Sequence, residues 1–348
     1  MKRLIRPALA MVLGVSAVLV PTTAEARPRV TSAIVFVSDR DSAPGEVQDD
    51  VYLYDVRTRR TSRLTHDLQG EVFPRLSPDG RYLAYAASTF PGVQVCRVHL
   101  AGSGWTCSSP RPLVGYPGVT GGNWQWAPDG RAVVFGGQAL GEPDGDIYRV
   151  ELEGFSPPQN LTDEGPGEEE VTEFQPTVSP DGTHVVYSRA GDLWQRRIDG
   201  TQPVQLTATP LPAAEFGAEY SPDGRHLAFH SNRRAPASLG TDDVDVYVMA
   251  PRPESAANRP LDLTAEITAP SGGPSRERFP TFSPDGERIA FAFSDLGTPA
   301  DPGRDFDAEI YAMRRDGSDV VNLTANNPAD PAAPPVGDIT PDWGRVRR

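Results

Sequence analysis

The stretch Ser77-Pro78-Asp79-Gly80 decides the fold, because it recurs along the chain. The same four residues return at 179–182, 221–224 and 283–286, and Ala127-Pro128-Asp129-Gly130 differs from them in one residue. Proline fixes φ near −65°, aspartate accepts hydrogen bonds from the neighbouring backbone, and glycine tolerates positive φ. Each copy therefore predicts a tight turn.

Strand patterns flank every one of these turns. An apolar residue precedes each turn, and an apolar or alternating segment such as Tyr82-Leu83-Ala84-Tyr85 follows it. The copies are spaced by 50, 52, 42 and 62 residues, which is typical of a β-propeller blade with variable loops. We expect each turn to join the first and second strands of a blade.

Third and fourth strands complete each repeat. Third strands are predicted at 50–54, 93–96, 146–149, 192–194, 245–248 and 309–312, several of them containing Asp-Ile-Tyr or a close variant. Fourth strands are predicted to end in Leu-Thr at 64–65, 161–162, 206–207, 263–264 and 323–324, with Leu113-Val114 as the variant copy. Four strands in each repeat match one propeller blade.

The two ends of the chain supply one further blade. A strand at 34–37 has third and fourth strands after it but no turn motif before it. A degenerate sixth copy of the motif lies at 340–344, and we expect a strand from Asp338 to Trp343 there. Pairing this C-terminal strand with the N-terminal three would leave no open edge. The sequence thus predicts an all-β, six-bladed propeller of four-stranded antiparallel blades over residues 27–348.

The N-terminus has the pattern of a secretory signal peptide. Lys2, Arg3 and Arg6 precede an apolar run at 8–20, and Ala24-Glu25-Ala26 offers a small-residue cleavage site. The alternative is a membrane anchor, but 13 apolar residues are too few for a bilayer, which needs about 20. We therefore expect removal of residues 1–26 and an exported protein without membrane insertion, in the periplasm or outside the cell.

The whole repeat resembles the TolB-type propeller repeat. The unit reads x-Pro-x-aromatic-Ser-Pro-Asp-Gly, then an apolar strand, Ser-x-Arg, Asp-Ile-Tyr and Leu-Thr, and the stretch 34–41 is especially similar. The resemblance implies a propeller that engages an extended segment of a partner protein at its central tunnel and can hold cations there. TolB itself has an α/β domain before its propeller, and we expect the propeller of this sequence to begin within about ten residues of the predicted cleavage site. Similar repeats occur in prolyl-oligopeptidase-like enzymes and in some lyases that act on pectate-derived oligosaccharides, so the repeat implies a fold rather than an activity.

Acidic residues gather in the loops of one predicted face. In antiparallel blades, the loops joining strands two and three share a face with the connections between blades. The long segments of that face, such as 38–50, 162–175 and 293–309, are rich in aspartate and glutamate. With a formal net charge of −14, the chain favours cations or a basic partner and disfavours nucleic acid. Ordinary solvation of surface loops is the alternative interpretation.

Closely spaced carboxylates on this face are candidate calcium ligands. Short Asp-x-Asp segments supply the several oxygens that calcium prefers, and the candidates are Asp39, Asp41, Asp305 and Asp307. Calcium is the only cofactor that the sequence suggests.

Polar residues of the predicted first strands are candidates for partner binding near the tunnel. They are Arg75, Gln125, Glu219 and Asp342, and packing between blades is the alternative role for them.

Cys96 and Cys107 flank a turn at 101–104, so a hairpin could place them opposite each other. Export permits a disulfide between them, and two free thiols are the alternative.

The function that these patterns favour is an exported, monomeric binding propeller for a protein or peptide, with calcium as a candidate modulator. The chain has no Gly-x-Ser-x-Gly nucleophile elbow, phosphate-binding loop or His-Glu-x-x-His motif. The alternatives are an enzyme, of saccharide lyase or hydrolase type, acting in the propeller funnel, and an envelope scaffold without a discrete ligand.

Overall fold

The regular structure of this chain consists of β-strands. The computed structural model describes residues 30–41, 49–66, 71–89, 92–100, 105–107, 124–138, 144–152, 157–163, 171–234, 243–267, 269–298, 301–302, 308–325 and 337–347. In these ranges all the named elements are strands, and no helix is long and apolar enough to cross a membrane. The predicted signal peptide lies outside the described residues.

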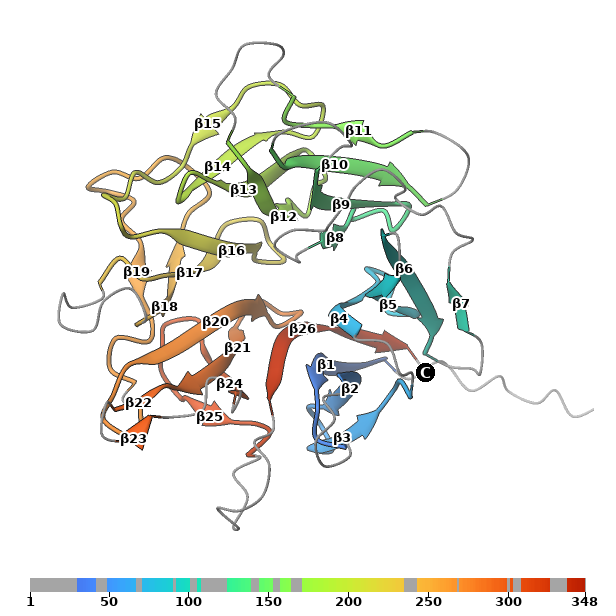
Figure 1. Ribbon diagram of the computed structural model, residues 1–348, viewed down its shortest axis with the longest axis vertical. Helices are drawn as coiled ribbons and strands as arrows, with labels where there is room; N and C mark the ends of the chain where they lie inside the picture. Colours follow the sequence, from blue (N-terminus) through green and yellow to red (C-terminus); the bar gives the residue numbers. More distant parts are fainter. Residues whose placement is uncertain are drawn as a thin grey trace, which may run out of the picture.

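Six four-stranded antiparallel sheets surround a common centre (Figure 1). Each sheet is named here as a blade after its innermost strand. The β26 blade consists of β26 (Asp338–Arg347), β1 (Val30–Ser38), β2 (Asp50–Asp55) and β3 (Arg60–Arg63), and the β4 blade of β4 (Glu71–Leu76), β5 (Tyr82–Thr89), β6 (Gly92–His99) and β7 (Trp105–Cys107). The β8 blade consists of β8 (Trp124–Trp126), β9 (Ala132–Gly137), β10 (Asp146–Glu151) and β11 (Gln159–Asn160), and the β12 blade of β12 (Glu173–Val178), β13 (His184–Arg189), β14 (Asp192–Arg197) and β15 (Val204–Gln205).

The remaining two blades follow the same order. The β16 blade consists of β16 (Glu215–Tyr220), β17 (Leu227–Ser231), β18 (Asp245–Met249) and β19 (Leu261–Asp262), and the β20 blade of β20 (Ser275–Phe282), β21 (Arg288–Asp295), β24 (Ala308–Arg314) and β25 (Val321–Asn322). A small ribbon of β22 (Gly297–Thr298) and β23 (Asp301–Pro302) lies between β21 and β24 in the chain. The predicted β-propeller of four-stranded antiparallel blades is confirmed.

The repeated tetrapeptide forms the turn between the first two strands of a blade. In the first copy, Ser77 Oγ donates a hydrogen bond to Asp79 Oδ1 at 2.6 Å and accepts one from Tyr82 N at 2.9 Å. Gly80 has a φ of 70°, which glycine adopts at little cost. The copies at Ser179, Ser221 and Ser283 repeat the contact between serine and aspartate. The face that carries these turns is called the turn face, and the opposite face is called the loop face.

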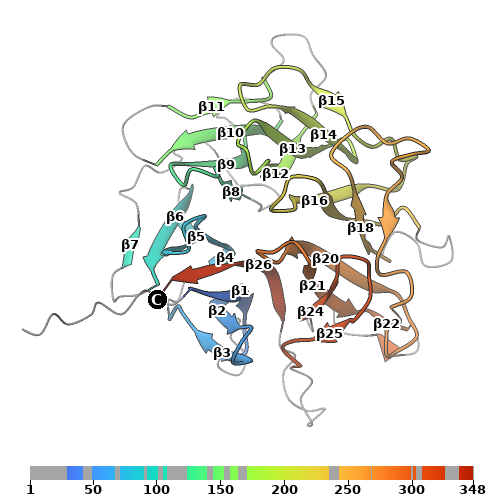
Figure 2. The ribbon, with the colours of Figure 1, turned by 180° about the vertical axis from the view of Figure 1, so that it is seen from behind.

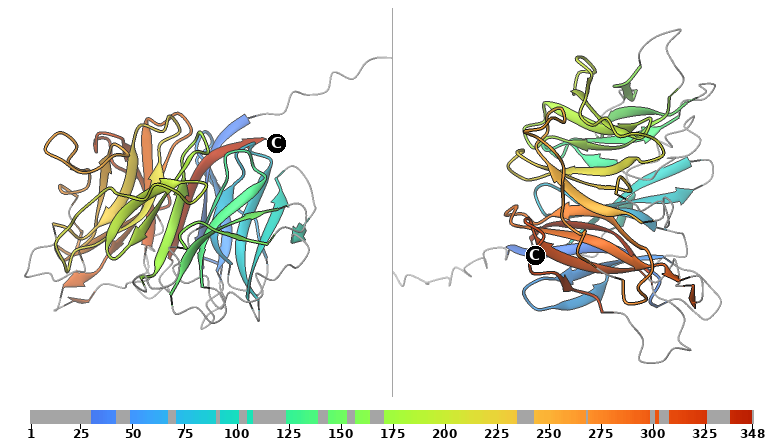
Figure 3. Two further views of the ribbon diagram at one scale, coloured as in Figure 1. Left: turned by 90° about the horizontal axis from the view of Figure 1, so that it is seen from above. Right: turned by 90° about the vertical axis from the view of Figure 1, so that its left-hand side faces the viewer.

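The C-terminal strand pairs with the N-terminal strand. β26 runs antiparallel to β1 from the pair Ser38 and Asp338 to the pair Val30 and Arg347. It lies between β4 and β20 when seen from either side, and its end projects from the turn face beside the start of β1 (Figures 1, 2 and 3). Residues 340–344, the degenerate sixth copy, are part of this strand and do not form a turn. They take the place of the x-Pro-x-aromatic half of the repeat, not of its Ser-Pro-Asp-Gly half.

The Asp-Ile-Tyr and Leu-Thr motifs hold the third strand of a blade in position. In the β16 blade, Thr264 Oγ1 donates to Asp245 Oδ1 at 3.0 Å and accepts from Val246 N at 2.9 Å. The backbone half of this contact recurs in the blades containing Thr65, Thr162, Thr207 and Thr324. The tyrosine stacks on an aromatic residue of the second strand, as Tyr247 does on Phe229 at 5.7 Å. These motifs therefore serve the fold, although aspartate is their first residue.

The variant blade differs from the prediction in its fourth strand. The outermost strand of the β4 blade is β7, whereas Leu113-Val114 lies outside the described residues. The register of β6 with β7 pairs Cys96 with Cys107. Opposed residues of antiparallel strands have Cα atoms about 4.5–5.5 Å apart, which a disulfide can span. The disulfide stays a prediction.

Candidate functional site

The innermost strands share a β-bulge with unusual backbone geometry. Five residues at the same place in five of these strands have a φ between 51° and 58°: Phe73, Gln175, Gly217, Phe279 and Thr340. At each of them, two residues oppose one residue of the neighbouring strand. Proline follows in four of the five, and Gly217 is the one glycine. The sequence shows x-Pro in these strands, but nothing in it predicted a left-handed Phe, Gln or Thr.

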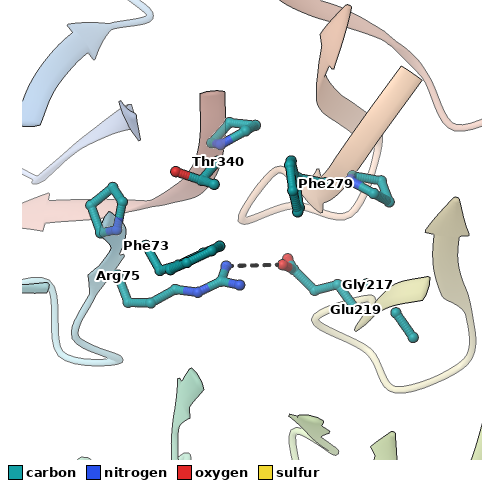
Figure 4. A pocket seen from close by; sticks show the side chains of 10 residues that line it. Phe73, Arg75, Gly217, Glu219, Phe279 and Thr340 are labelled. Carbon is teal, nitrogen blue, oxygen red and sulfur yellow. Dashed lines mark hydrogen bonds and ion pairs between the residues drawn. The ribbon is translucent and has the colours of Figure 1, made fainter. Parts of the chain in front are cut away.

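Four of these bulges line a pocket at the centre of the molecule (Figure 4). Its lining residues are Phe73, Pro74, Arg75, Gly217, Ala218, Glu219, Phe279, Pro280, Thr340 and Pro341. The cavity is ≈ 10 Å³, which is about the space that one water molecule needs. A peptide or sugar therefore does not fit within this central pocket as it stands.

An ion-pair group lies in the wall of the central pocket. Arg75 Nη1 is 3.0 Å from Asp342 Oδ1 and 3.4 Å from Glu219 Oε2 (the latter contact is dashed in Figure 4). Arg75 Nε also donates to the carbonyl oxygen of Trp124 at 3.2 Å. Burial raises the pKa of Glu219, opposed by Arg75 and assisted by Asp342. Residues of four blades thus meet at one guanidinium group.

Each of the four predicted partner-binding residues bonds its own first strand to the first strand of the next blade. Gln125 Oε1 accepts from Val178 N at 3.3 Å, Glu219 Oε1 from Phe282 N at 3.2 Å, and Asp342 Oδ2 from Leu76 N at 2.7 Å. With Arg75, they connect the β26, β4, β8, β12, β16 and β20 strands in pairs. The structure brings all four to one level of the molecule, where they support packing between blades.

Two residues that sequence reasoning missed complete this set. Gln175 Oε1 accepts from Gly217 N at 2.8 Å, and Thr281 Oγ1 accepts from Trp343 N at 3.1 Å. Consecutive innermost strands are thereby joined all the way round by contacts that involve a side chain. Thr281 stands two residues before Ser283, as Arg75 stands two before Ser77. That register could have identified it.

Aromatic rings form a continuous arc beside the central pocket. The aromatic arc consists of Phe73, Phe279, His230, Phe216 and Phe174, whose consecutive centroids are 6.4, 5.4, 5.9 and 5.8 Å apart. The four phenylalanines are half-buried. His230 is the penultimate residue of β17, next to the connection to β18, so the arc lies toward the loop face.

His230 is the buried member of the aromatic arc. Its side chain lies where a Cβ on Gly217 would come within 2.6 Å of the ring, so the glycine makes room for it. Burial lowers the pKa of His230 to about 3, with Arg278 contributing, and the ring is neutral at physiological pH. Its Nδ1 is buried without a hydrogen-bond partner among the described residues.

Three buried carboxylates at the loop-face ends of innermost strands are engaged within the protein. Asp338, Glu173 and Glu215 begin three innermost strands, are buried, and pair with Arg40, Arg189 and Arg233 at 2.7, 3.0 and 2.8 Å. The Ser-x-Arg and related arginines of the repeat are these partners. Part of the acidic character that the sequence assigned to a ligand thus stabilises the blades.

Glu277 departs from this pattern. It is 1% exposed, and its Oε1 has no hydrogen-bond partner among the described residues. Burial raises its pKa to about 9, and the charges of Asp245 and Asp243 add to the effect. Sequence reasoning did not single out this residue, because its burial depends on the packing of β20 against residue 244 of the preceding blade.

Two of the four predicted metal ligands, Asp39 and Asp41, lie in the described part of the chain. Asp39 Oδ1 accepts from Gly337 N at 2.8 Å, and Asp41 Oδ2 accepts from Tyr52 Oη at 2.6 Å. Asp305 and Asp307 lie outside the described residues. Within the described part of the chain, no group of three or more His, Cys, Asp or Glu side chains is arranged to hold a metal ion.

Comparison with known proteins supports the fold. No family model matches the chain. An uncharacterized protein from Agrobacterium fabrum is 26% identical over 290 residues, which cover 80% of this chain and 84% of that protein. TolB from Acinetobacter baumannii has a TM-score of 0.64 at 16% identity and covers 90% of this chain, which spans only 66% of TolB.

Two further solved structures are similar. A TolB candidate from Agrobacterium tumefaciens has a TM-score of 0.57 at 22% identity, covering 86% of this chain and 89% of its own. An oligogalacturonate lyase in complex with manganese has a TM-score of 0.51 at 18% identity, covering 81% and 72%. Identities this low establish a common architecture and no common activity. By these likenesses, the chain has the β-propeller fold of TolB-like proteins.

Proposed function

We propose that this chain is an exported binding propeller that holds a basic peptide or protein segment on its loop face, at the mouth of the central pocket. The proposal takes the six sheets as blades of one ring that β26 closes. It also takes residues 1–26 as a cleaved signal peptide, and residues 27–348 as a monomer in the periplasm or outside the cell.

The observation that carries this proposal is the aromatic arc. Half-buried aromatic rings in contact with one another offer flat apolar area at little conformational cost, and they also attract cations over their faces. They lie beside a central pocket too small for a ligand, so an occupant would rest on them rather than pass through. The acidic composition of the loops that the sequence predicts for this face favours a basic occupant.

The ion pairs of Arg75 also support this proposal, because they fix the strands that carry the aromatic arc. Arg75 and Glu219 lie in the wall of the central pocket, and together with Asp342 they make contacts between strands that hold the bulges carrying Phe73 and Phe279. These contacts keep the aromatic rings in place before a ligand binds, which lowers the entropic cost of binding. Arg75, Gln125, Glu219 and Asp342 would therefore position the surface.

Fluorescence anisotropy with a labelled peptide tests the proposal. The probe is Ac-Gly-Arg-Leu-Arg-Leu-Arg-Gly-NH2, and the same peptide with glutamate for arginine is the control. We expect salt-sensitive binding of the basic peptide alone, weakened about tenfold by Phe279→Ala. Val321→Ala, on an exposed outer strand, should leave binding unchanged. Equal binding of both peptides, or equal effects of both variants with their melting temperatures matched, would overturn the proposal.

Calcium is proposed as a modulator of the acidic face, with Asp39, Asp41, Asp305 and Asp307 as its ligands. A ligand that binds only the folded state raises its melting temperature in a saturable way. Thermal unfolding of residues 27–348 is therefore compared in calcium, in EDTA and in sodium chloride of matched ionic strength. A rise specific to calcium supports the site, and equal melting temperatures remove it.

An enzyme acting on a saccharide in the funnel is the second candidate. The structural likeness to an oligogalacturonate lyase with bound manganese favours it. Incubation of the protein with oligogalacturonate and manganese, followed by ultraviolet absorbance, reports unsaturated products. Turnover abolished by EDTA would establish the enzyme, whereas a flat trace at high protein concentration would leave the binding proposal alone.

A further inference from the structure

The largest described cavity lies on the turn face, opposite the aromatic arc. It has a volume of ≈ 630 Å³ and lies between the β8 and β12 blades. A second hollow of ≈ 290 Å³ lies between the β4 and β8 blades. Both are bounded by Pro128 and Asp129 of the second turn, so they flank that turn on its two sides. Cavities of this size hold ligands, unlike the central pocket.

The spacing of neighbouring turns differs at this place. A Cβ added to the glycine of a turn would approach the proline of the turn in the preceding blade. The distance would be 4.0 Å at Gly130 and 3.9 Å at Gly182. The corresponding distance is 3.6 Å at both Gly224 and Gly286. The two hollows therefore coincide with the two wider gaps in the row of turns.

Aspartates fixed by their own turns line the larger hollow. Asp181 Oδ1 accepts from Ser179 Oγ and Thr183 Oγ1 at 2.6 and 2.7 Å, and Asp199 Oδ1 accepts from Thr201 Oγ1 at 2.6 Å. These hydrogen bonds lower the pKa of Asp181 to about 2, so it is ionised at neutral pH. Asp129 Oδ1 accepts from Arg131 N at 2.9 Å.

The second oxygens of two of these carboxylates are available to a ligand. Within the described ranges, no hydrogen bond or ion pair uses Oδ2 of Asp129 or Asp181. Arg149 is the basic residue among the described lining residues, and it pairs with Glu151 at 2.6 Å. Two carboxylates with a preset orientation thus line the hollow, and no arginine of the described residues forms an ion pair with either of them.

The walls of the hollow are apolar. Ala127, Pro128, Val178 and Ile198 line it together with the aspartates. Lysine and arginine side chains combine an aliphatic stem with a charged end, and they bury the stem against apolar surface while the end stays polar. We propose that the hollow between the β8 and β12 blades is a second binding site, which takes a lysine or arginine side chain of an extended segment from a partner protein.

This site lies beyond the proposed function, because it is on the opposite face and uses no residue of the aromatic arc. An extended segment that crosses the turn at Asp129 could place a second side chain in the smaller hollow, where Asp79 and Asp129 are the acidic residues. Two such contacts on one segment strengthen each other through effective concentration.

A pair of double variants tests the proposal with the peptide probe used above. Asp129→Asn with Asp181→Asn removes two charges from the hollow, and asparagine keeps the acceptor that each turn needs. Asp223→Asn with Asp285→Asn makes the same change at the same turn position in two other blades. Both pairs are measured in the Phe279→Ala background, where the loop-face site is weakened and the turn-face site dominates binding. There we expect the first pair to weaken binding about tenfold and the second to change it less than twofold.

A blocking variant gives a second measurement. Gln159→Arg adds a long cation at the exposed rim of the hollow, and Val321→Arg adds one at the equivalent outer-strand position of another blade. Only the first should reduce binding. Equal effects of the matched variants would overturn the proposal, and so would displacement of the peptide by calcium that depends on Asp129 and Asp181. If Phe279→Ala weakens binding while the aspartate pair does not, this inference fails and the proposed function stands.

Discussion

At the scale of single residues, Gly217 meets two demands at once. Its φ is 58°, and an added Cβ would come within 2.6 Å of His230 Cε1. We predict that Gly217→Ala lowers the free energy of unfolding by about 2–4 kcal/mol, from backbone strain and overpacking together. Gly272→Ala is the control, since Gly272 has a φ of 72° with nothing within 4 Å of the added Cβ.

The control should lose only about 1 kcal/mol, because it carries the backbone strain without the clash. Urea unfolding followed by tryptophan fluorescence measures both. Losses of the same size in the two variants would show that the ring of His230 moves aside freely, so that Gly217 does not hold it in the aromatic arc.

Glu277 makes a prediction about pH. Its pKa rises from 4.5 to about 9 because it is buried, so the folded protein keeps a proton that the unfolded chain releases above pH 4.5. This contribution to stability is present below pH 4.5 and is lost as the pH rises toward 9. Gln cannot ionise, and we therefore expect Glu277→Gln to gain about 1 kcal/mol or more over the wild type between pH 5 and pH 8.

Denaturant unfolding at the two pH values checks the change for Glu277. Glu215→Gln is the contrasting variant, because it removes the partner of Arg233 at 2.8 Å and should destabilise the protein at both pH values. A Glu277→Gln difference that does not depend on pH would mean that a cation or water, not a proton, satisfies the carboxyl group.

At the scale of elements, the turn motif and the strands beside it could be predicted because their causes are local. Proline, aspartate and glycine fix the turn within four residues, and the alternation of apolar side chains marks the strands. The bulges could not be predicted, since Phe73, Gln175 and Thr340 have positive φ only because neighbouring blades hold them there. The same holds for the aromatic arc, whose rings come from four blades.

The Leu-Thr motif gives a prediction for the third strand. Thr264 is 1% exposed, donates to Asp245 and accepts from Val246 N. We expect Thr264→Val to lower the free energy of unfolding by about 1–3 kcal/mol, because it leaves a buried donor and a buried acceptor unsatisfied. Thr201→Val is the control, because its hydroxyl bonds exposed Asp199 and water can replace it. Equal losses by urea unfolding would contradict a role for burial.

At the scale of the whole molecule, the sequence assigned the acidic loop face to a ligand, and the structure divides that charge. Part of it pairs with arginines such as Arg40 and Arg233 inside the blades. Composition could not predict this division, because the sequence does not show which aspartates and glutamates form ion pairs. The burial of Glu277 could be recognised only from the three-dimensional structure, because it depends on the residues packed around it.

The contacts of β26 predict how the whole molecule holds together. Trp343 and Val346 of β26 are buried, and Asp342 Oδ2 accepts a hydrogen bond from Leu76 N. The strand lies between β4 and β20 (Figure 1). A chain that ends at residue 337 loses these contacts on both sides. We expect it to melt at a markedly lower temperature, since removing core residues as large as tryptophan costs about 3–5 kcal/mol each.

Adding back a synthetic peptide of residues 338–347 should restore the melting temperature in trans. The recovery should depend on peptide concentration, because binding to the folded form alone shifts stability by mass action. The same peptide with Trp343→Ala should restore less, since Trp343 packs between blades and its Nε1 donates to Ser32 Oγ at 2.7 Å. If the shortened chain and the full chain have the same melting temperature, β26 does not contribute to thermal stability. The other five blades would then account for it.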